Sequence, residues 1–451
     1  FILRIEDTDQ LRSNAEFEKS IFEGLKWMGL DWDEGPTPNG EEKGSFGPYL
    51  QSKRVEKEIY KPFVEKLLSQ DKAYFCYCSE KELADMREKA QLEKRPPKYD
   101  MRCRNLTPEQ RKQKEDEGLK PVIRFKMPQS GTTVFNDAIR GEVKFENKLL
   151  YDLILVKASG YPTYNFACVV DDYLMKITQV IRGDDHLTNT AHQFNIYKAL
   201  GFKTPEFIHL SMIHASDGTK LSKRHGHTNV IEYKDKGFLP VVLRNYLALL
   251  GWSTSDSQQI FKEGELESKF DIKGCQKSPS MFDLVKLTWM NGEYIRMLSP
   301  EGLKDLAMPF IEKAGIEINV SDEKLTQIIA LEQEKYKLLS EIPHLIEFFF
   351  TDKITYRDED VKKIFKKPDV GQLLGEIKLR YEKLNDFSES AIEQATRDYA
   401  KENQIKTGQI FHPLRLAVSG RTQGPTLFKM IEYIGKSATL ERILKAIGLC
   451  D

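Results

Sequence analysis

Short apolar runs alternate with amphipathic stretches along the first part of the chain. Residues 1–5 have a strand pattern, and residues 13–28 have a helical pattern that begins at the capping-box pair Ser13 and Glu16 and ends at Gly29. A strand, an acidic turn and a helix in this order form a βα unit. In open α/β sheets, ligands bind at the carboxyl ends of the strands, so the residues after this strand are candidates for a site.

A second βα unit follows in the middle of the chain. Residues 177–181 predict a buried strand, and a helix is predicted from about residue 188 to residue 200, where Gly201 ends it. Another apolar strand, residues 207–213, leads directly into a basic loop. The repeated unit predicts an α/β fold.

The pattern changes in the last third of the chain. Residues 299–451 alternate amphipathic helical segments with short breaks, for example at residues 345–350, 377–384 and 427–434. A chain of 451 residues exceeds what one core organises, so two to four domains are expected. The last third predicts a separate helical domain.

Composition excludes some classes of protein but does not identify one. The chain has 68 Lys plus Arg against 69 Asp plus Glu, so a polyanionic partner would have to bind local basic patches. Lys362, Lys363, Lys366 and Lys367 form such a run, although a solvated helix face explains it as well. No apolar run reaches membrane-spanning length, and the six cysteines suit a reducing compartment, which predicts a cytoplasmic protein without a membrane anchor.

The basic loop carries the first candidate chemistry. Lys220 and Lys223 flank a serine between Gly218 and Gly226, and two ammonium groups at this spacing can converge on one polyphosphate. A lysine placed there would stabilise the charge that develops as pyrophosphate leaves ATP. A solvated basic loop remains the alternative.

Other candidates lie at the ends of the predicted strands. Glu6 can hold a substrate ammonium, Arg182 presents a planar fork to a carboxylate, and Asp185 can accept from ribose hydroxyls or assist a hydrated Mg²⁺. Tyr164 can offer its hydroxyl to a ligand. The alternatives are local capping or a surface ion pair for Glu6, an ion pair that only holds the loop together for Arg182 and Asp185, and a packed aromatic ring for Tyr164.

Taken in order, these strings resemble a known family. The chain is similar to bacterial-type glutamyl-tRNA synthetases, a class I family of aminoacyl-tRNA synthetases. The matching strings are R-I-E-D-T-D within Phe1–Asp9, G-Y-P-T-Y at Gly160–Tyr164, V-I-R-G-D-D-H at Val180–His186, K-L-S-K-R at Lys220–Arg224, W-M-N-G at Trp289–Gly292 and P-L-R at Pro413–Arg415.

The resemblance implies ATP-dependent attachment of L-glutamate to the 3′ end of tRNA(Glu) through a glutamyl-adenylate, with Mg²⁺ and usually with the tRNA bound before activation. It implies that Glu6 holds the glutamate amino group, that Tyr164 and Arg182 hold its carboxylates, and that Asp185 and the backbone of Ile213 contact the nucleotide. Lys223, helped by Lys220, is the matching phosphate lysine.

The resemblance also implies four regions. They are a Rossmann-like catalytic domain (1–72 and 158–215), an inserted module for the acceptor end (73–157), the lysine loop with a stem-contact domain (216–298), and a helical anticodon-binding domain (299–451). The family is commonly monomeric, so a monomer is expected.

Two departures from the family pattern bear on the site. The H-I-G-H-type motif has no counterpart in these residues, and we expect it to precede Phe1 in the natural protein. Cys168 lies where some relatives place an asparagine toward the glutamate pocket, which puts that substrate contact in doubt.

The inserted module contains a candidate metal site. Cys76, Cys78 and Cys103 supply three thiolates, a set that suits structural Zn²⁺, and no histidine lies in the module. Tyr99 resembles a tyrosine ligand of the related glutamyl-queuosine tRNA synthetases and is the predicted fourth ligand, while Asn105 stands where some relatives have histidine. Three free cysteines are the alternative.

Two other functions remain open at this point. A glutaminyl-tRNA synthetase shares the catalytic fold, but the helical last third disfavours it because its usual C-terminal half is built of β-barrels. A catalytically silent tRNA-binding paralogue is disfavoured because Glu6, Arg182 and both loop lysines are present. Preference for tRNA(Glu) over tRNA(Gln) depends on few anticodon contacts, and Lys335 lies in the helix we suspect.

Overall fold

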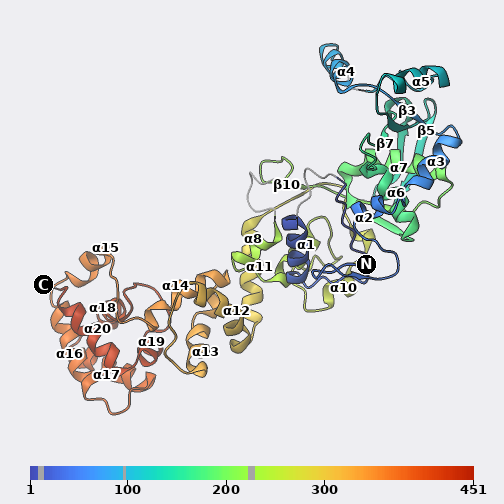
Figure 1. Cartoon of the computed structure of the whole chain (residues 1–451). Helices are drawn as coiled ribbons and strands as arrows, with labels where there is room; N and C mark the ends of the chain where they lie inside the picture. Colours follow the sequence, from blue (N-terminus) through green and yellow to red (C-terminus); the bar gives the residue numbers. More distant parts are fainter. Residues whose placement is uncertain (9–14, 95–97, 222–228, 451) are drawn as a thin grey trace. The chain divides into compact units, whose positions relative to one another are not determined.

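A computed structural model describes residues 1–8, 15–94, 98–221 and 229–450. The chain divides into two compact units (Figure 1). The first unit comprises Phe1–Ile231 and Leu243–Asp283, and the second comprises Glu232–Val242 and Leu284–Asp451.

A four-stranded sheet organises the first unit. Its strand order is β6 (Gly141–Glu146), β5 (Thr132–Asp137), β9 (Glu206–Leu210) and β8 (Gln179–Gly183), with β6 antiparallel to β5 and the other neighbours parallel. Phe207, Ile208 and His209 in the centre of β9 are buried, as expected for a strand with parallel neighbours on both sides. The register pairs Arg182 with His209, so both lie near the carboxyl ends of adjacent strands.

Three helices build the core beside this sheet. The α6 helix (Tyr164–Leu174) packs against α7 (Leu187–Leu200), and α3 (Lys61–Ser69) contacts α7. Gly201 ends α7 in the left-handed conformation, as the sequence predicts. Their shared core contains Leu67, Phe166, Val169, Ile196, Tyr197 and Phe207, each at most 2% exposed.

A second sheet in the first unit is antiparallel throughout. It contains β3 (Ala73–Cys76), β4 (Val122–Phe125) and β7 (Ile154–Val156), with β4 in the middle. The helices α4 (Glu80–Leu92) and α5 (Pro108–Asp116) each begin with a complete capping box, at Ser79 and Thr107. The β5–β6 hairpin lies between β4 and β7 along the chain but pairs with β9, so the two sheets interleave in sequence.

The predicted first strand is not a continuous strand. Within Phe1–Ile5, only Ile2 and Ile5 form isolated bridges, to Glu34 and Leu50, because the neighbouring backbone belongs to irregular segments. The predicted helix is present as α1 (Ala15–Trp27), and its expected cap Ser13 lies outside the described residues. The remaining elements of residues 1–283 are short: β1 (Gly35–Pro36), β2 (Glu42–Lys43), α2 (Gln51–Glu56), β10 (Ile213–His214), α8 (Val230–Asp235), α9 (Pro240–Leu249), α10 (Glu265–Lys269) and β11 (Ser280–Met281).

Among its described residues, the second unit contains helices joined by turns and irregular segments, and no strand. Its helices are α11 (Leu284–Met297), α12 (Pro300–Lys313), α13 (Asp322–Ala330), α14 (Ile342–Ile346), α15 (Asp358–Asp360), α16 (Val370–Glu382), α17 (Glu389–Glu402), α18 (Thr407–Ser419), α19 (Leu427–Ile434) and α20 (Lys436–Ile447). The predicted helices 377–384 and 427–434 correspond to α16 and α19, whereas 345–350 is divided between the end of α14 and a 3₁₀ turn at Glu347–Phe349. The core joins Leu374, Ile377, Leu414, Met430 and Ile431.

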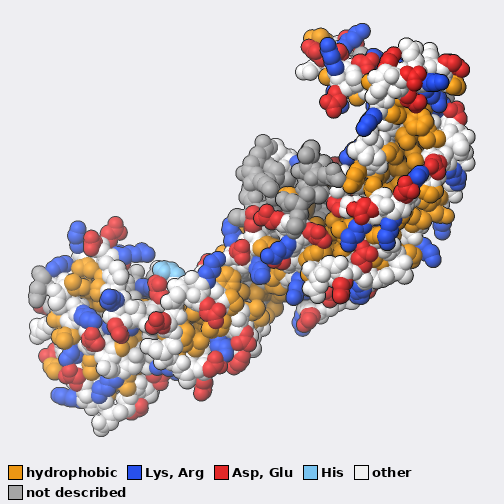
Figure 2. Space-filling model, in the orientation of Figure 1, with side chains coloured by type: hydrophobic (Ala, Val, Ile, Leu, Met, Phe, Trp, Pro, Cys, Tyr) orange, Lys and Arg blue, Asp and Glu red, His pale blue; other side chains and the backbone are white. Residues whose placement is uncertain are grey.

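Surface properties agree with the near-neutral composition. Lys, Arg, Asp and Glu side chains are mixed over the visible face of each unit (Figure 2). None of the described helices combines the length and hydropathy that a membrane span requires.

Candidate functional site

The carboxylate of Glu6 lies at the amino-terminal part of α6. Its Oε1 accepts a hydrogen bond from Arg4 Nη2 at 3.1 Å and one from Cys168 Sγ at 3.2 Å. The Glu6 side chain is 35% exposed, which leaves it accessible to a ligand. The structure therefore brings Glu6 and Cys168 together, a contact that the sequence did not predict, with the thiol donating to Glu6.

A buried acidic pair on α6 fixes Arg4. Asp172 accepts from Arg4 Nη1 at 2.8 Å, and Asp171, which is fully buried, binds the side chain of Arg54 at 2.7 Å. Burial raises the pKa of both carboxyl groups, an effect that the neighbouring guanidinium groups oppose. Because a buried charge needs its partner, this network holds Arg4, and through it Glu6, in one arrangement.

Arg182 lies at the end of β8 and is held from several sides. Its Nη1 donates to Tyr164 Oη at 3.1 Å, and its Nη2 donates to Thr190 Oγ1 at 2.5 Å and Gln193 Oε1 at 2.7 Å. Its Nε donates to His209 Nε2 at 3.4 Å. Four of the five guanidinium N–H groups thus have partners among the described residues, and one on Nη1 remains for a ligand.

Tyr164 connects the two charged groups. It is the first residue of α6, and Cys168 follows one turn later on the same helix face, at a Cβ separation of about 6 Å. Burial, with the neighbouring Cys168 in second place, raises the pKa of Tyr164 to about 12, so its hydroxyl stays protonated. Within one turn of α6, Cys168 therefore contacts the Glu6 carboxylate and Tyr164 contacts the Arg182 guanidinium.

The residues predicted to bind ATP lie beyond β8. Asp185 Oδ2 and Lys220 Nζ are 2.7 Å apart and both side chains are exposed, and the Lys220 hydrogen bond lowers the pKa of Asp185. The carbonyl oxygen of Ile213 accepts from the backbone N–H of Leu221 at 3.1 Å, which joins β10 to the start of the lysine loop. Lys223, the predicted phosphate ligand, lies outside the described residues.

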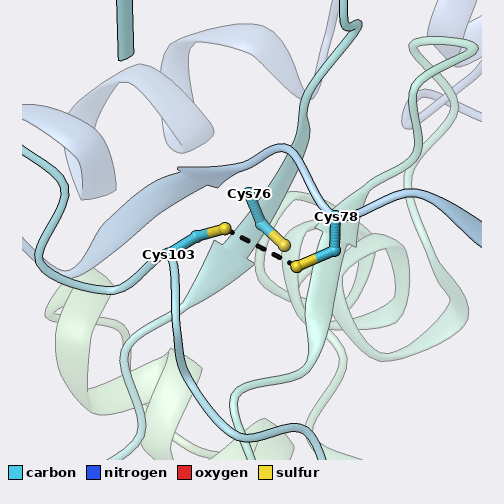
Figure 3. Close-up of side chains that lie close together, drawn as sticks. All are labelled: Cys76, Cys78 and Cys103. Carbon is cyan, nitrogen blue, oxygen red and sulfur yellow. Dashed lines mark hydrogen bonds between the residues drawn. The ribbon is translucent and has the colours of Figure 1, made fainter. Parts of the chain in front are cut away.

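Three thiols converge at the edge of the antiparallel sheet (Figure 3). Cys76 ends β3, and the Sγ atoms of Cys76, Cys78 and Cys103 all lie within 4.8 Å of one another, with Cys78 and Cys103 3.6 Å apart. Tyr99 Oη lies 3.3 Å from Cys76 Sγ and 3.8 Å from Cys78 Sγ. All four predicted metal ligands therefore meet at one point.

These separations fit tetrahedral zinc. Ligand bonds of about 2.3 Å to sulfur give sulfur–sulfur edges of about 3.8 Å, close to the 3.6 Å between Cys78 and Cys103. The backbone N–H of Cys103 donates to Tyr99 Oη at 3.2 Å and aims the phenol at the cluster. Among the described residues this is the one group of three or more Cys, His, Asp or Glu ligands close enough to share an ion.

Sequence reasoning missed the residues that hold the site from behind. Arg4 stands inside a quoted motif but received no role, and Asp171 and Asp172 read as ordinary helix residues. Asp137 and His209 come from different strands, 72 residues apart. For His209, the signal in the sequence was a polar residue within a predicted strand whose other residues are largely apolar.

Comparison with known proteins places this geometry in a family. Residues 1–289 match the family model described as tRNA synthetases class I (E and Q), catalytic domain, and residues 302–447 match the model described as anticodon binding domain. The glutamate–tRNA ligase of Elusimicrobium minutum is 54% identical over 447 residues, which cover 99% of this chain and 91% of that protein. The glutamate–tRNA ligase of Moorella thermoacetica is 45% identical over 450 residues, with the same coverage.

Solved structures agree. The crystal structure of a glutamate tRNA ligase from Elizabethkingia meningosepticum in complex with its amino acid superimposes with a TM-score of 0.89 at 34% identity, covering 99% of this chain and 92% of that chain.

The mixed sheet, the helical second unit and the two matching family models together identify a class I aminoacyl-tRNA synthetase. Within that class, the chain belongs to the glutamyl- and glutaminyl-tRNA synthetase family. The predicted fold class, a class I catalytic domain followed by a helical anticodon-binding region, is confirmed, and so is the prediction of a tRNA ligase acting on glutamate.

Proposed function

We propose that this chain attaches L-glutamate to the 3′ end of tRNA(Glu) through a glutamyl-adenylate, with release of AMP and diphosphate. The observation that supports this most strongly is the pairing of opposite charges around one turn of α6. Glu6 lies at Cys168 and Arg182 lies at Tyr164, and the two sites are about 6 Å apart on the helix. Glutamate carries an ammonium and two carboxylates, which match this arrangement.

Glu6 binds the substrate ammonium, and Arg182 with the Tyr164 hydroxyl binds carboxylate oxygens. The charge-assisted hydrogen bonds in such pairs are about twice as strong as neutral ones. Cys168 forms the wall between them and donates to Glu6, which orients the carboxylate in place of the amide found in some relatives.

Asp185 and the backbone of Ile213 bind the nucleoside part of ATP, while Lys220 and Lys223 bind its phosphates beside Mg²⁺. Lys220 Nζ lies 2.7 Å from Asp185 Oδ2, and both side chains are exposed. A triphosphate can therefore compete with Asp185 for the lysine at low energetic cost. As the diphosphate leaves, a lysine in this position stabilises the developing negative charge.

Charging assays with purified tRNA(Glu) and tRNA(Gln) test the proposed function. We expect glutamate to be attached to tRNA(Glu) in an ATP-dependent reaction, with Arg182→Lys raising the KM for glutamate because a lysine cannot make the forked contacts. The proposal would be contradicted by a protein that attaches glutamine instead of glutamate to tRNA, or by one that binds tRNA without attaching an amino acid to it.

We also propose that Cys76, Cys78, Tyr99 and Cys103 hold a structural Zn²⁺ that shapes the module receiving the acceptor end of the tRNA. The short distances among the three Sγ atoms and Tyr99 Oη support this, and the phenol is the weakest of the four donors. A bound ion would link the end of β3, at Cys76, to the segment after α4 that contains Tyr99 and Cys103.

Metal analysis of protein purified without chelator tests the zinc proposal. About one zinc per chain is expected, with loss in Cys103→Ser, weaker retention in Tyr99→Phe, and no change in the control Cys275→Ser. Less than about 0.2 zinc per chain in the unmodified protein would reject the site.

The remaining partner assignments follow from the reaction. We propose that the helical second unit binds the anticodon arm of tRNA(Glu), that the enzyme works as a monomer, and that it acts in the cytoplasm where tRNA is charged. Light scattering of the purified protein at micromolar concentration checks the monomer.

A further inference from the structure

A buried chain of polar groups runs from the hairpin β5–β6 to Arg182. Asp137, at the end of β5, and His209, in β9, are both fully buried, with 0% side-chain exposure. Asp137 Oδ2 lies 2.7 Å from His209 Nδ1 and also accepts the His209 backbone N–H at 3.0 Å. On the other side of the ring, Nε2 lies 2.9 Å from Thr190 Oγ1 and 3.4 Å from Arg182 Nε.

The hydrogen-bond partners determine which nitrogen carries the proton. A carboxylate only accepts hydrogen bonds, so Nδ1 must carry hydrogen to bond Asp137 at 2.7 Å. Arg182 Nε only donates, so Nε2 must present its lone pair. Thr190 Oγ1 accepts from Arg182 Nη2, and its single hydrogen can point either to the same ring nitrogen at 2.9 Å or to the carbonyl oxygen of His186 at 3.1 Å.

The other carboxylate oxygen of Asp137 is also fully used. Its Oδ1 accepts the backbone N–H groups of Ile139 and Arg140 at 3.0 and 2.8 Å. The carboxylate therefore receives four hydrogen bonds and cannot turn. This rigidity is transmitted to the ring, because the imidazole is held through both its backbone and its side chain.

We propose that Asp137 and His209 are positioning residues for Arg182. Asp137 fixes the tautomer and plane of His209, and His209 with Thr190 fixes the guanidinium so that its remaining Nη1 hydrogen faces the substrate carboxylate. This inference rests on the proposed function, in which Arg182 binds glutamate. The charged and titratable groups around the ring are Asp137 from β5, Arg182 from β8 and His186 from the turn before α7, and burial lowers the pKa of His209.

Two substitutions at His209 separate positioning from general stability. His209→Asn keeps an amide donor near the Nδ1 position, toward Asp137, but removes the acceptor at Nε2. His209→Gln reaches the Nε2 position with an amide oxygen and restores an acceptor for Arg182. We expect His209→Asn to raise the KM for glutamate by about tenfold with an unchanged KM for ATP, and His209→Gln to stay within about threefold.

The assay is tRNA charging by the full chain at saturating ATP and tRNA(Glu), with thermal unfolding of each variant measured in parallel. A glutamate KM unchanged in His209→Asn overturns the inference, as does an equal rise in the KM values for glutamate and ATP, or equal effects of the Asn and Gln variants. If His209→Asn does not fold, Asp137→Asn decides in the same way, because an amide donor facing Nδ1 moves the ring hydrogen to Nε2, where it faces the Arg182 Nε–H.

Arg182→Lys distinguishes failure of the proposed substrate-binding role of Arg182 from failure of the positioning role of Asp137 and His209. If this variant leaves the glutamate KM unchanged, the proposed role of Arg182 fails and the inference fails with it. If Arg182→Lys raises the glutamate KM and the His209 variants do not, only the inference is rejected.

Discussion

Replacing Glu6 by glutamine is the perturbation that most cleanly probes the binding of the substrate ammonium. The amide has nearly the same shape and can still accept from Arg4 and Cys168, which lie at 3.1 and 3.2 Å from Oε1, so the pocket should keep its form. What disappears is the negative charge. Asp172 and Asp171 continue to balance Arg4, since they lie 2.8 and 3.8 Å from it.

The expected magnitude follows from the exposure of the group. A hydrogen bond between charged groups contributes about 1.5–3 kcal/mol, and partial exposure screens it toward the lower value. The Glu6 side chain is 35% exposed, so we take the lower end. About 1.5 kcal/mol corresponds to a rise of roughly tenfold in the KM for glutamate.

The assay is tRNA charging as a function of glutamate concentration, at saturating ATP and tRNA(Glu). The KM for ATP should not change, because the nucleotide binds other residues. Glu58→Gln serves as the matched control, since Glu58 is an exposed residue of the same unit whose carboxylate pairs with Lys61. A glutamate KM for Glu6→Gln equal to that of the control would refute the reasoning.

Three further predictions follow from other parts of the molecule. Lys223→Ala should slow glutamate-dependent pyrophosphate exchange by roughly a hundredfold or more if the lysine stabilises the leaving diphosphate, and unchanged exchange would remove it from the mechanism. Burial lowers the pKa values of His192 and His209, so the unfolded chain takes up protons first. Stability should therefore be fully present above pH about 6.5 and decline as the pH falls below it, which melting temperatures between pH 7.5 and 5.5 will show; a flat profile in this window would contradict the account. Asp171→Asn should destabilise the first unit by about 3 kcal/mol because Arg54 loses its buried partner, and urea unfolding that leaves the midpoint of that unit unchanged would argue against the network.

The sequence predicted elements well where the apolar pattern alone decides the structure. The helix at residues 427–434 appears with the same bounds because its apolar face packs into the helical core. The strand predicted at 177–181 is displaced to Gln179–Gly183, and the one predicted at 207–213 ends at Leu210, because pairing with β9 and β8 sets the ends and a single sequence does not contain that register. The strand at residues 1–5 failed for a related reason, since its backbone finds only isolated partners.

The site was predicted as far as motifs name individual residues. Glu6 contacts Cys168, Arg182 contacts Tyr164, and the four residues of the predicted metal site lie close together, whereas their roles toward substrate and metal stay predictions. The groups that hold them were not predictable, because contacts such as Asp137 with His209 join strands far apart in sequence. Their polarity acquires meaning only when the sheet places them side by side.

Crystallography of the enzyme with a nonhydrolysable glutamyl-adenylate analogue tests the central claim most directly. The account predicts the glutamyl ammonium about 3 Å from the Glu6 carboxylate and a glutamyl carboxylate within hydrogen-bonding distance of Arg182 Nη1 and Tyr164 Oη. A bound analogue whose ammonium lies away from Glu6, or whose carboxylate does not touch Arg182, would contradict it.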